Sequence, residues 1–299
     1  MKLKVMKTKT DKDKSRLIIL PVVIVVAVVT QIPFILTIIL SFVRWNVKRP
    51  DLGIGFAGIS NFKEVLTNMD FYKVLLNTLL LSGVTLIIST VLAIGLGLLF
   101  NREFKGVNLC RTLLVMPYFV MEAVVGIVWK TLMLNPSLGL NHYISRFFGI
   151  APIDFLGQHS LETVMILIIW QWTPFLFLII MAGLQGMPND IIESAKIDGA
   201  KGWRLIWNIY IPLIRGHINV AMTLGLINIL KVFGLIYVTT AGGPGISSSN
   251  LPYYSYSALF YDWNIGKASV IAIVTVVITL IIVQFFYRRI NKAESTSTP

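Results

Sequence analysis

The side chains of this sequence that could perform acid-base or metal chemistry are too scattered to predict a catalytic centre. The three histidines, His142, His159 and His217, lie in different segments without His-x-x-x-His spacing, so the sequence does not indicate a zinc site. The single cysteine, Cys110, excludes an internal disulfide and a cysteine-based metal cluster. Neither a G-x-x-x-x-G-K-[ST] phosphate loop nor a G-x-S-x-G nucleophile motif occurs. We therefore expect no enzyme activity and no cofactor bound by this chain.

One apolar stretch combines aromatic rings with an amide. Residues 170–175 read Trp-Gln-Trp-Thr-Pro-Phe. Aromatic faces stack on the C–H surfaces of sugars and polyols, and an amide hydrogen-bonds their hydroxyl groups, so Gln171, Trp172 and Phe175 are candidate contacts for such a solute. The alternative is that these tryptophans belong to an interfacial aromatic belt or to helix packing.

Two ionisable residues, Glu122 and Lys231, lie well inside apolar stretches. Charged side chains are costly in hydrocarbon and must face protein or water. One interpretation places them on the wall of a polar cavity. The other, which we favour, is a structural pair between Glu122 and Lys231, or pairing with another subunit.

The elements that would position these residues are membrane-spanning helices. Of the 299 residues, 56% are hydrophobic and only 13% are charged, whereas about a quarter are charged in soluble domains. A hydrocarbon core about 30 Å thick requires roughly 20 apolar residues per helix. The sequence thus predicts an all-α polytopic membrane protein with six spans: residues 17–43, 74–100, 111–134, 161–183, 217–238 and 267–287.

The distribution of positive charge predicts the orientation. With the amino terminus inside, 17 of the 26 lysine and arginine residues lie in the interior segments, as the positive-inside rule requires. We predict cytoplasmic tails at 1–16 and 290–299 and a transmembrane region at 17–289, with both termini cytoplasmic. The net charge of +12 then indicates contact with anionic lipid rather than nucleic acid.

The longest polar interruption in the second half of the chain lies within the cytoplasmic segment 184–216. Asn189 or Asp190 can cap a helix, so we predict a short helix over Asp190–Ile197. This helix would place apolar side chains on one face with two charged residues beside it: Ile191, Ile192 and Ala195, with Glu193 and Lys196.

A second short helix is predicted over Trp203–Tyr210. Gly199 supplies the turn between the two helices, because a Cβ would hinder it, and Pro212 ends the second helix. Two short amphipathic helices meeting at a glycine form either a protruding docking element or a pair that lies on lipid headgroups. These physical arguments leave both interpretations open.

Three groups of residues in this segment resemble a known motif: Glu193-Ser194-Ala195, Ile197-Asp198-Gly199-Ala200 and Ile211-Pro212-Leu213. The pattern resembles the EAA loop of binding-protein-dependent ABC importer permeases, in which E-A-A-x-x-D-G-A is followed by I-x-L-P. The sequence departs from the pattern at Ser194, where alanine is usual, and at Ile211, where leucine is usual. Leu184-Gln185-Gly186-Met187-Pro188 and Thr240-Ala241-Gly242-Gly243-Pro244 are similar to flanking motifs of the carbohydrate-importing, maltose-type permeases.

The resemblance implies a type I ABC importer permease fold in a bacterial or archaeal cell membrane. It implies four kinds of partner: a second permease, a cytoplasmic ATPase dimer that holds ATP and Mg²⁺, an external solute-binding protein, and a sugar or polyol substrate. The loop would couple this chain to the ATPase. The residues that match the coupling motif are Glu193, Ala195, Asp198, Gly199, Ala200 and Pro212.

The resemblance also suggests residues of the substrate path. Alignment of the fifth span to the family places Gly225, Asn228, Ile229 and Val232 at sugar-contacting positions, with Lys231 beside them. Residues 243–256 lie outside and resemble the polyol (mannitol and sorbitol) subgroup through Asn250-Leu251-Pro252-Tyr253-Tyr254. We expect this loop to contact the binding protein or an external gate, with a tyrosine-rich interfacial loop as the alternative.

Two other functions are compatible with six spans. An ion-coupled secondary transporter would need intramembrane acids at coupling positions, for which Glu122 is the single candidate. A non-transport membrane scaffold would need no partner ATPase. Uptake by this chain alone, driven by an ion gradient without ATP, would favour the secondary transporter.

Overall fold

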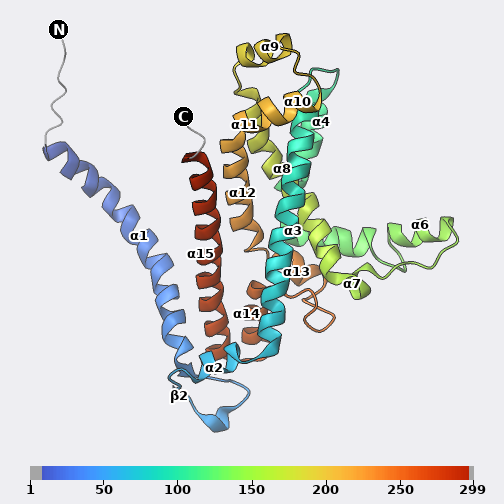
Figure 1. The fold of residues 1–299 in the computed structure, drawn as a ribbon. Helices are drawn as coiled ribbons and strands as arrows, with labels where there is room; N and C mark the ends of the chain where they lie inside the picture. Colours follow the sequence, from blue (N-terminus) through green and yellow to red (C-terminus); the bar gives the residue numbers. More distant parts are fainter. Residues whose placement is uncertain (1–8, 296–299) are drawn as a thin grey trace. The chain divides into compact units, whose positions relative to one another are not determined.

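The computed structural model describes residues 9–295, which fold almost entirely into helices (Figure 1). Four helices contain segments long and apolar enough to cross a membrane: α1 (Lys9–Ser41), α3 (Met69–Phe100), α8 (Ser160–Gln185) and α15 (Ile265–Ser295). The number rises to six if each of two bent helix pairs is one span: Val107–Phe119 with Glu122–Met133, and Trp203–Leu213 with Arg215–Ile229. This total equals the predicted count, although the second pair begins and ends earlier in the chain than the predicted fifth span, 217–238.

Parts of both predicted cytoplasmic tails are helical, and the tail boundaries themselves stay predictions. Helix α1 begins at Lys9 and α15 continues to Ser295, so helix extends into both predicted tails, 1–16 and 290–299. Backbone hydrogen bonds of a helix do not require apolar side chains, so a helix can continue past the hydrophobic segment into polar sequence. Residues 1–8 and 296–299 of the predicted tails lie outside the described residues.

The chain forms two compact units. The first combines residues 1–67 with 257–273 and contains α1, the strand pair β1 (Val43–Arg44) and β2 (Gly55–Phe56), the 3₁₀ turn η1 (Pro50–Leu52) and α2 (Ser60–Leu66). The buried amide of Asn61 holds this unit together by donating to the carbonyls of Ser41 and Val43, each at 2.9 Å.

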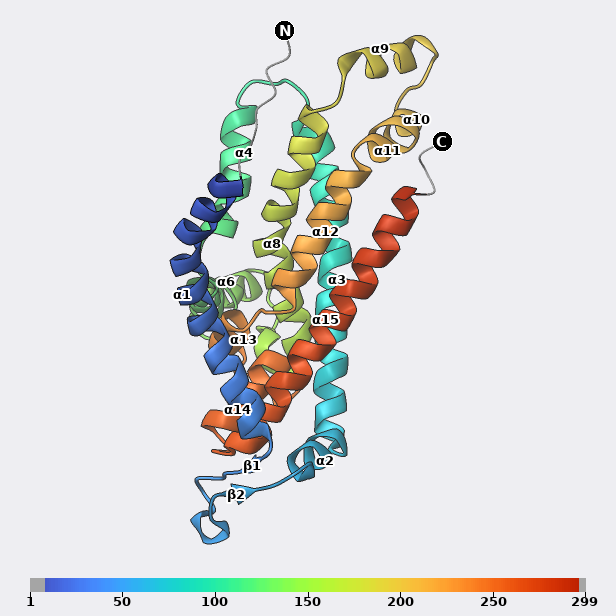
Figure 2. The same cartoon turned by 90° about the vertical axis from the view of Figure 1, so that its left-hand side faces the viewer.

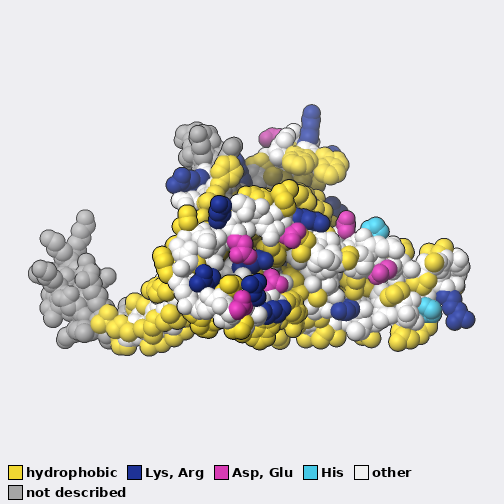
Figure 3. All heavy atoms as spheres, turned by 90° about the horizontal axis from the view of Figure 1, so that it is seen from below, with side chains coloured by type: hydrophobic (Ala, Val, Ile, Leu, Met, Phe, Trp, Pro, Cys, Tyr) yellow, Lys and Arg dark blue, Asp and Glu magenta, His cyan; other side chains and the backbone are white. Residues whose placement is uncertain are grey.

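The polar surface of the first unit carries charges of both signs. Arg49 pairs with Asp51 at 3.3 Å, and Lys267 pairs with Asp262 at 3.4 Å. Basic and acidic side chains are intermixed on the face of the molecule seen in Figure 3. A mixed surface of this kind does not produce a strong field of one sign.

The second unit, residues 68–256 and 274–299, is organised around α3, α8 and α12 (Arg215–Ile229), which run side by side in Figures 1 and 2. Small residues allow these helices to approach closely. A Cβ on Gly225 would lie 3.1 Å from Leu86 and 3.2 Å from Leu176, and a Cβ on Gly97 would lie 3.0 Å from Leu184.

The third predicted span, 111–134, is not a continuous helix. It consists of α4 (Val107–Val115), the 3₁₀ turn η2 (Met116–Phe119), α5 (Glu122–Val128) and the π-helical turn η3 (Trp129–Met133), with a bend of 100° between the two halves. Pro117 lies in the 3₁₀ turn, and its missing N–H and ring disfavour a regular helix there. Val120 then takes an extended conformation that ends the first half.

The fifth predicted span, 217–238, is also interrupted. Helix α12 ends at Ile229, residues 230–233 break the helix, and the short α13 (Gly234–Thr239) follows. The break contains no proline, so the sequence gives no strong local signal for it. The short helices α6 (Leu140–Phe147), α7 (Phe155–Gln158) and α14 (Leu251–Phe260) complete the connections between the spans.

Candidate functional site

The predicted pair of helices in segment 184–216 is present and has nearly the predicted boundaries. Helix α9 spans Asn189–Ile197, and the second helical stretch consists of α10 (Trp203–Leu205), the π turn η4 (Ile206–Tyr210) and α11 (Ile211–Leu213). The turn lies at Gly199, whose φ of +85° is strained for any residue with a Cβ. Figures 1 and 2 place these helices at one end of the second unit, away from α13. We call residues 189–213 the knob.

The predicted cap of α9 is wrong. Pro188 occupies the N-cap position, and no side-chain hydrogen bond caps this helix. Asn189 and Asp190 lie inside the first turn, where an acidic side chain still suits the positive end of the helix dipole.

The knob exposes apolar side chains that the sequence pattern did not identify. Ala195 is the one buried residue of α9, whereas Ile197 is 85% exposed, Trp203 74% and Trp207 62%. The carboxyl-bearing residues Glu193 and Asp198 are also exposed. Tryptophans in an otherwise polar segment were the available signal for such a surface.

The other predicted coupling residues shape the knob. Ala200 is half-buried and its N–H donates to the carbonyl of Ala195 at 2.9 Å, which closes the turn after α9. Pro212 is exposed in the first turn of α11. The structure thus brings all six predicted coupling residues into one protruding element.

The predicted path residues of α8 lie beside the break in the third span. Gln171 is buried, and its Nε2 donates to the carbonyl of Val120 at 2.8 Å. Trp172 and Phe175 contact Tyr118 with ring centroids 5.7 and 5.2 Å apart, and the Tyr118 and Phe175 rings are stacked. Tyr118 was not predicted, because its place in an apolar stretch gave no sign that it would meet α8.

Residues 171–173 of α8 each have one buried polar atom without a hydrogen-bond partner among the described residues, and Thr173 Oγ1 belongs to a residue that lines a separate cavity. Gln171 Oε1 and Trp172 Nε1 are buried and have no hydrogen-bond partner among the described residues. Such atoms are costly to bury unless a water or ligand satisfies them. The aromatic cluster Tyr118, Trp172 and Phe175 therefore lies beside one free acceptor and one free donor.

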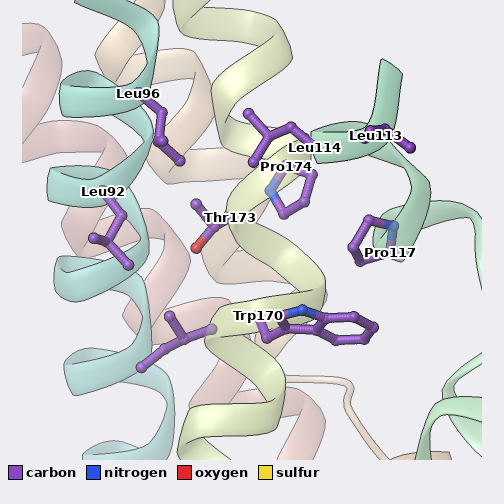
Figure 4. A pocket seen from close by; sticks show the side chains of 9 residues that line it. Leu92, Leu96, Leu113, Leu114, Pro117, Trp170, Thr173 and Pro174 are labelled. Atoms are coloured by element: carbon purple, nitrogen blue, oxygen red, sulfur yellow. The ribbon is translucent and has the colours of Figure 1, made fainter. Parts of the chain in front are cut away.

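Trp170 lies on a different, apolar surface of α8. It lines a cavity of about 280 Å³ between α3, α4 and α8 (Figure 4). Its other lining residues are Leu92, Leu96, Leu113, Leu114, Pro117, Ile169, Thr173 and Pro174. This lining lacks the convergent polar groups that a sugar requires.

Three of the predicted path residues of the fifth span face the core of their own unit. Gly225 is buried, Ile229 is 0% exposed and Val232 is 1% exposed. These three residues therefore contact the core of their own unit, and their predicted place on a substrate path stays a prediction. Asn228 stays partly exposed, with Nδ2 donating to the Leu224 carbonyl at 2.8 Å, and Lys231 is exposed.

Glu122 does not pair with Lys231. Within residues 9–295, Glu122 Oε2 instead accepts a hydrogen bond from the backbone N–H of Gly234 at 3.0 Å, and no ion pair joins it to Lys231. The favoured prediction of a direct pair between these two side chains is therefore wrong. The carboxylate satisfies a backbone donor that the break in the fifth span leaves free.

The last three residues of the loop 240–250 are deeply buried, whereas Ala241, Pro244 and Gly245 are exposed. Ser248, Ser249 and Asn250 are at most 2% exposed. Asn77 Nδ2 on α3 donates to the carbonyls of Ile246, Ser247 and Ser249 at 3.0–3.3 Å, and Asn250 Nδ2 donates to the Val232 carbonyl at 2.6 Å. Tyr253 and Tyr254 are 3% and 8% exposed, so they do not form the tyrosine-rich interfacial surface that was the alternative prediction.

Comparison with known proteins identifies the family. Residues 89–295 match the model of the family described as binding-protein-dependent transport system inner membrane component. The chain belongs to this family. As a member of it, the protein is a multi-pass membrane permease of a binding-protein-dependent importer, and a transport subunit rather than an enzyme.

Relatives of this permease extend over most of its length. It is 33% identical to the trehalose/maltose transport system permease protein MalF of Thermococcus litoralis, over 88% of this chain and 89% of the relative. It is 32% identical to the sn-glycerol-3-phosphate transport system permease protein UgpA of Agrobacterium fabrum, over 81% of this chain and 83% of the relative.

The fold of this permease matches solved structures of the same architecture. A chain in the crystal structure of a bacterial alginate ABC transporter, in complex with an alginate pentasaccharide-bound periplasmic protein, superposes with a TM-score of 0.78. The match covers 94% of this chain and 95% of that chain at 23% identity. The predicted type I importer permease fold is therefore confirmed.

Proposed function

We propose that this permease imports a neutral sugar or polyol and couples its movement to a separate cytoplasmic ATPase through the knob. The knob carries the proposal: it presents exposed carboxylates and large apolar side chains, Ile197, Trp203 and Trp207, on one protruding element. Exposed tryptophans beside charged residues are typical of the energetic centre of a protein–protein interface.

The geometry of the knob suits the transmission of motion. Gly199 closes a tight turn between its two helical parts, and Ala195 packs inward while Glu193 and Asp198 point to solvent. A short rigid element held in a cleft of an ATPase would follow each closure of that ATPase and would move the attached helices. ATP and Mg²⁺ would then be bound by the partner and not by this chain.

The remaining parts of the transporter follow from the same proposal. A second permease would complete the path, and a solute-binding protein would deliver the substrate at the external face of a bacterial or archaeal membrane. Membrane lipid would surround the apolar helices, and no nucleic acid would take part.

The choice of cargo rests on the chemistry beside the helix break. The half-buried aromatic cluster Tyr118, Trp172 and Phe175 lies next to the unpaired Gln171 Oε1 and Trp172 Nε1. This combination suits a ring or chain with hydroxyl groups and C–H faces. The named relatives transport trehalose or maltose in one case and sn-glycerol-3-phosphate in the other, and we favour the uncharged class, with polyols as the narrower possibility.

Transport by reconstituted components tests the coupling. Liposomes containing this permease, the second permease and the ATPase, with the solute-binding protein and radiolabelled solute outside, should accumulate solute only when ATP is inside. Uptake driven by an ion gradient in the absence of ATP and of the ATPase would overturn the proposal. A membrane scaffold would show no uptake under either condition.

Direct binding to the solute-binding protein tests the cargo. Calorimetric titration with trehalose, maltose, mannitol, sorbitol and sn-glycerol-3-phosphate should yield tight binding for one uncharged member of this series. Selective binding of sn-glycerol-3-phosphate would contradict the proposed substrate class and leave the coupling proposal intact.

A further inference from the structure

Three residues that recur every fourth position of the third span contact the short helix α13. Glu122 Oε2 accepts the N–H of Gly234 at 3.0 Å, and Lys130 Nζ donates to the carbonyl of Val238 at 3.0 Å. Gly126 lies between them on α5 and faces Val238 directly. We call Glu122, Gly126 and Lys130, together with the helix that they hold, the clamp.

The two charged residues satisfy backbone groups at opposite ends of α13. This helix has only six residues, Gly234–Thr239, and a helix end leaves N–H and C=O groups that its own hydrogen bonds do not satisfy. Water is scarce at membrane depth, so such groups require partners from the protein. Hydrogen bonds to charged groups are about twice as strong as those between neutral groups.

Glycine sets the distance between the two helices. A Cβ on Gly126 would lie 3.0 Å from Val238 Cβ and 3.4 Å from Thr239 Cγ2. A Cβ on Gly234 would lie 3.2 Å from Glu122 Oε2 and 3.3 Å from Glu122 Cβ. A larger residue at either position would therefore require Val238 or Glu122 to shift by a few tenths of an ångström.

We propose that Glu122 and Lys130 are positioning residues for transport: they hold α13 as one body with α5 and thereby fix the break at residues 230–233. This break carries the exposed Lys231, while Val232 on its other side is anchored by Asn250 at 2.6 Å. The proposal rests on the proposed importer function. Glu122 acts as a hydrogen-bond acceptor that sets helix geometry, and its task does not require a proton to bind or leave.

If Glu122 acts as an acceptor, substitutions that keep a side-chain oxygen should differ in effect from substitutions that remove it. Glu122→Gln keeps a side-chain oxygen of the same reach, so it preserves the contact with Gly234, whereas Glu122→Ala removes it. Lys130→Arg keeps a donor for the Val238 carbonyl, and Lys130→Met does not. Glu162→Ala and Lys73→Ala are matched controls, because both residues are exposed and make no hydrogen bond or ion pair within the described part of the chain.

Hydrogen exchange of the assembled transporter in nanodiscs tests the clamp without requiring a substrate. Peptides that cover Gly234–Thr239 should exchange about tenfold faster in Glu122→Ala and Lys130→Met. Lys130→Arg and both controls should stay within about twofold of the unsubstituted protein, and Glu122→Gln, whose neutral oxygen accepts a weaker hydrogen bond than the carboxylate, should fall between them and Glu122→Ala. Unchanged exchange in Glu122→Ala would overturn the proposal.

Uptake and ATP hydrolysis in proteoliposomes test the functional consequence. Glu122→Ala should reduce solute uptake about tenfold while ATP hydrolysis continues, so that more ATP is consumed per solute, and Glu122→Gln should restore the ratio. A Glu122→Gln protein as defective as Glu122→Ala would show that ionisation matters and would overturn the acceptor role. If the unsubstituted complex imports no sugar or polyol, the proposed substrate class fails, and the exchange measurement still decides the clamp.

Discussion

The knob and the clamp are both built from short helices that meet at glycine residues, but they differ in how their side chains are satisfied. In the clamp, the side chains of Glu122 and Lys130 form hydrogen bonds with backbone groups of the same chain. In the knob, Ile197 and Trp203 are at least 74% exposed. The clamp thus satisfies groups of its own chain, whereas the exposed side chains of the knob fit the proposal that a partner protein covers them.

The largest expected effect comes from breaking the knob. Glu193→Lys reverses a charge at the proposed interface, and Gly199→Val places a β-branched residue at a φ of +85°, which costs roughly 1–2 kcal/mol or more for a non-glycine residue. ATP-driven uptake should fall below a few per cent while the protein remains in the membrane. Uptake assays combined with quantification of membrane-bound ATPase check this.

Gly95→Val is the control for Gly199→Val, because a Cβ on Gly95 meets no atom within 4 Å and its φ is not positive. Normal uptake in both knob variants would contradict the difference drawn between the knob and the clamp.

The exposed tryptophans of the knob should have the next largest effect. Trp203→Ala and Trp207→Ala should each weaken ATPase binding by about 2 kcal/mol, or roughly 30-fold, as is typical of interface hot spots. Binding of purified ATPase to the permease pair in nanodiscs measures this effect. Ile54→Ala, which truncates a side chain that is 68% exposed in the first unit, should leave the affinity for the ATPase unchanged. An equal loss of affinity in Ile54→Ala would contradict the assignment of the knob as the ATPase-binding surface.

A smaller effect is expected at Asn77, whose side chain forms hydrogen bonds within the same chain. Asn77→Ala removes the donor to the carbonyls of Ile246, Ser247 and Ser249 and should destabilise the protein by about 1–3 kcal/mol, because buried acceptors are left unpaired. Thermal unfolding in detergent should show a lower Tm with ATPase binding retained. Asn208→Ala, at an exposed residue, should leave Tm unchanged.

The smallest effects are expected on α12, where Gly225 faces the core and Asn228 is a candidate residue of the substrate path. Gly225→Ala should lower stability by about 1 kcal/mol through contact with Leu86 and Leu176, with the KM for uptake unchanged. Asn228→Ala should raise the KM for uptake and leave stability unchanged, because Asn228 is partly exposed. A raised KM for uptake in Gly225→Ala would show that Gly225 lines the substrate path.

The membrane class, the six spans and the knob were predictable because their signals are local. Hydrophobic runs of about 20 residues reflect the thickness of the bilayer, and the turn at Gly199 follows from the conformational freedom of glycine. The exposure of Ile197, Trp203 and Trp207 was not predicted, because an amphipathic pattern defines an apolar face but does not show whether the fold covers it. Side-chain exposure at Trp203 depends on the direction in which the helix packs.

The helix breaks and the partners of buried polar groups were decided by tertiary structure. The sequence of residues 230–233 contains no helix-breaking proline, and it suggested Lys231 as a partner for Glu122. The observed partner is the N–H of Gly234, 112 positions away from Glu122 along the chain. Which backbone group a half-buried carboxylate such as Glu122 satisfies depends on where two distant helices end, and that is a property of packing.

The sequence by itself thus determined what kind of molecule this is: a helical membrane permease with a short helix pair in segment 184–216. It did so because bilayer thickness, charge asymmetry and turn geometry constrain residues that lie close together in the sequence. Only the tertiary structure decided which side chains face the core, as Ile229 and Val232 do, and which side chains bind the backbone at a helix break, as Gln171 does with the Val120 carbonyl. In a membrane every freed backbone group must find a partner, and those partners come from segments far apart in the chain.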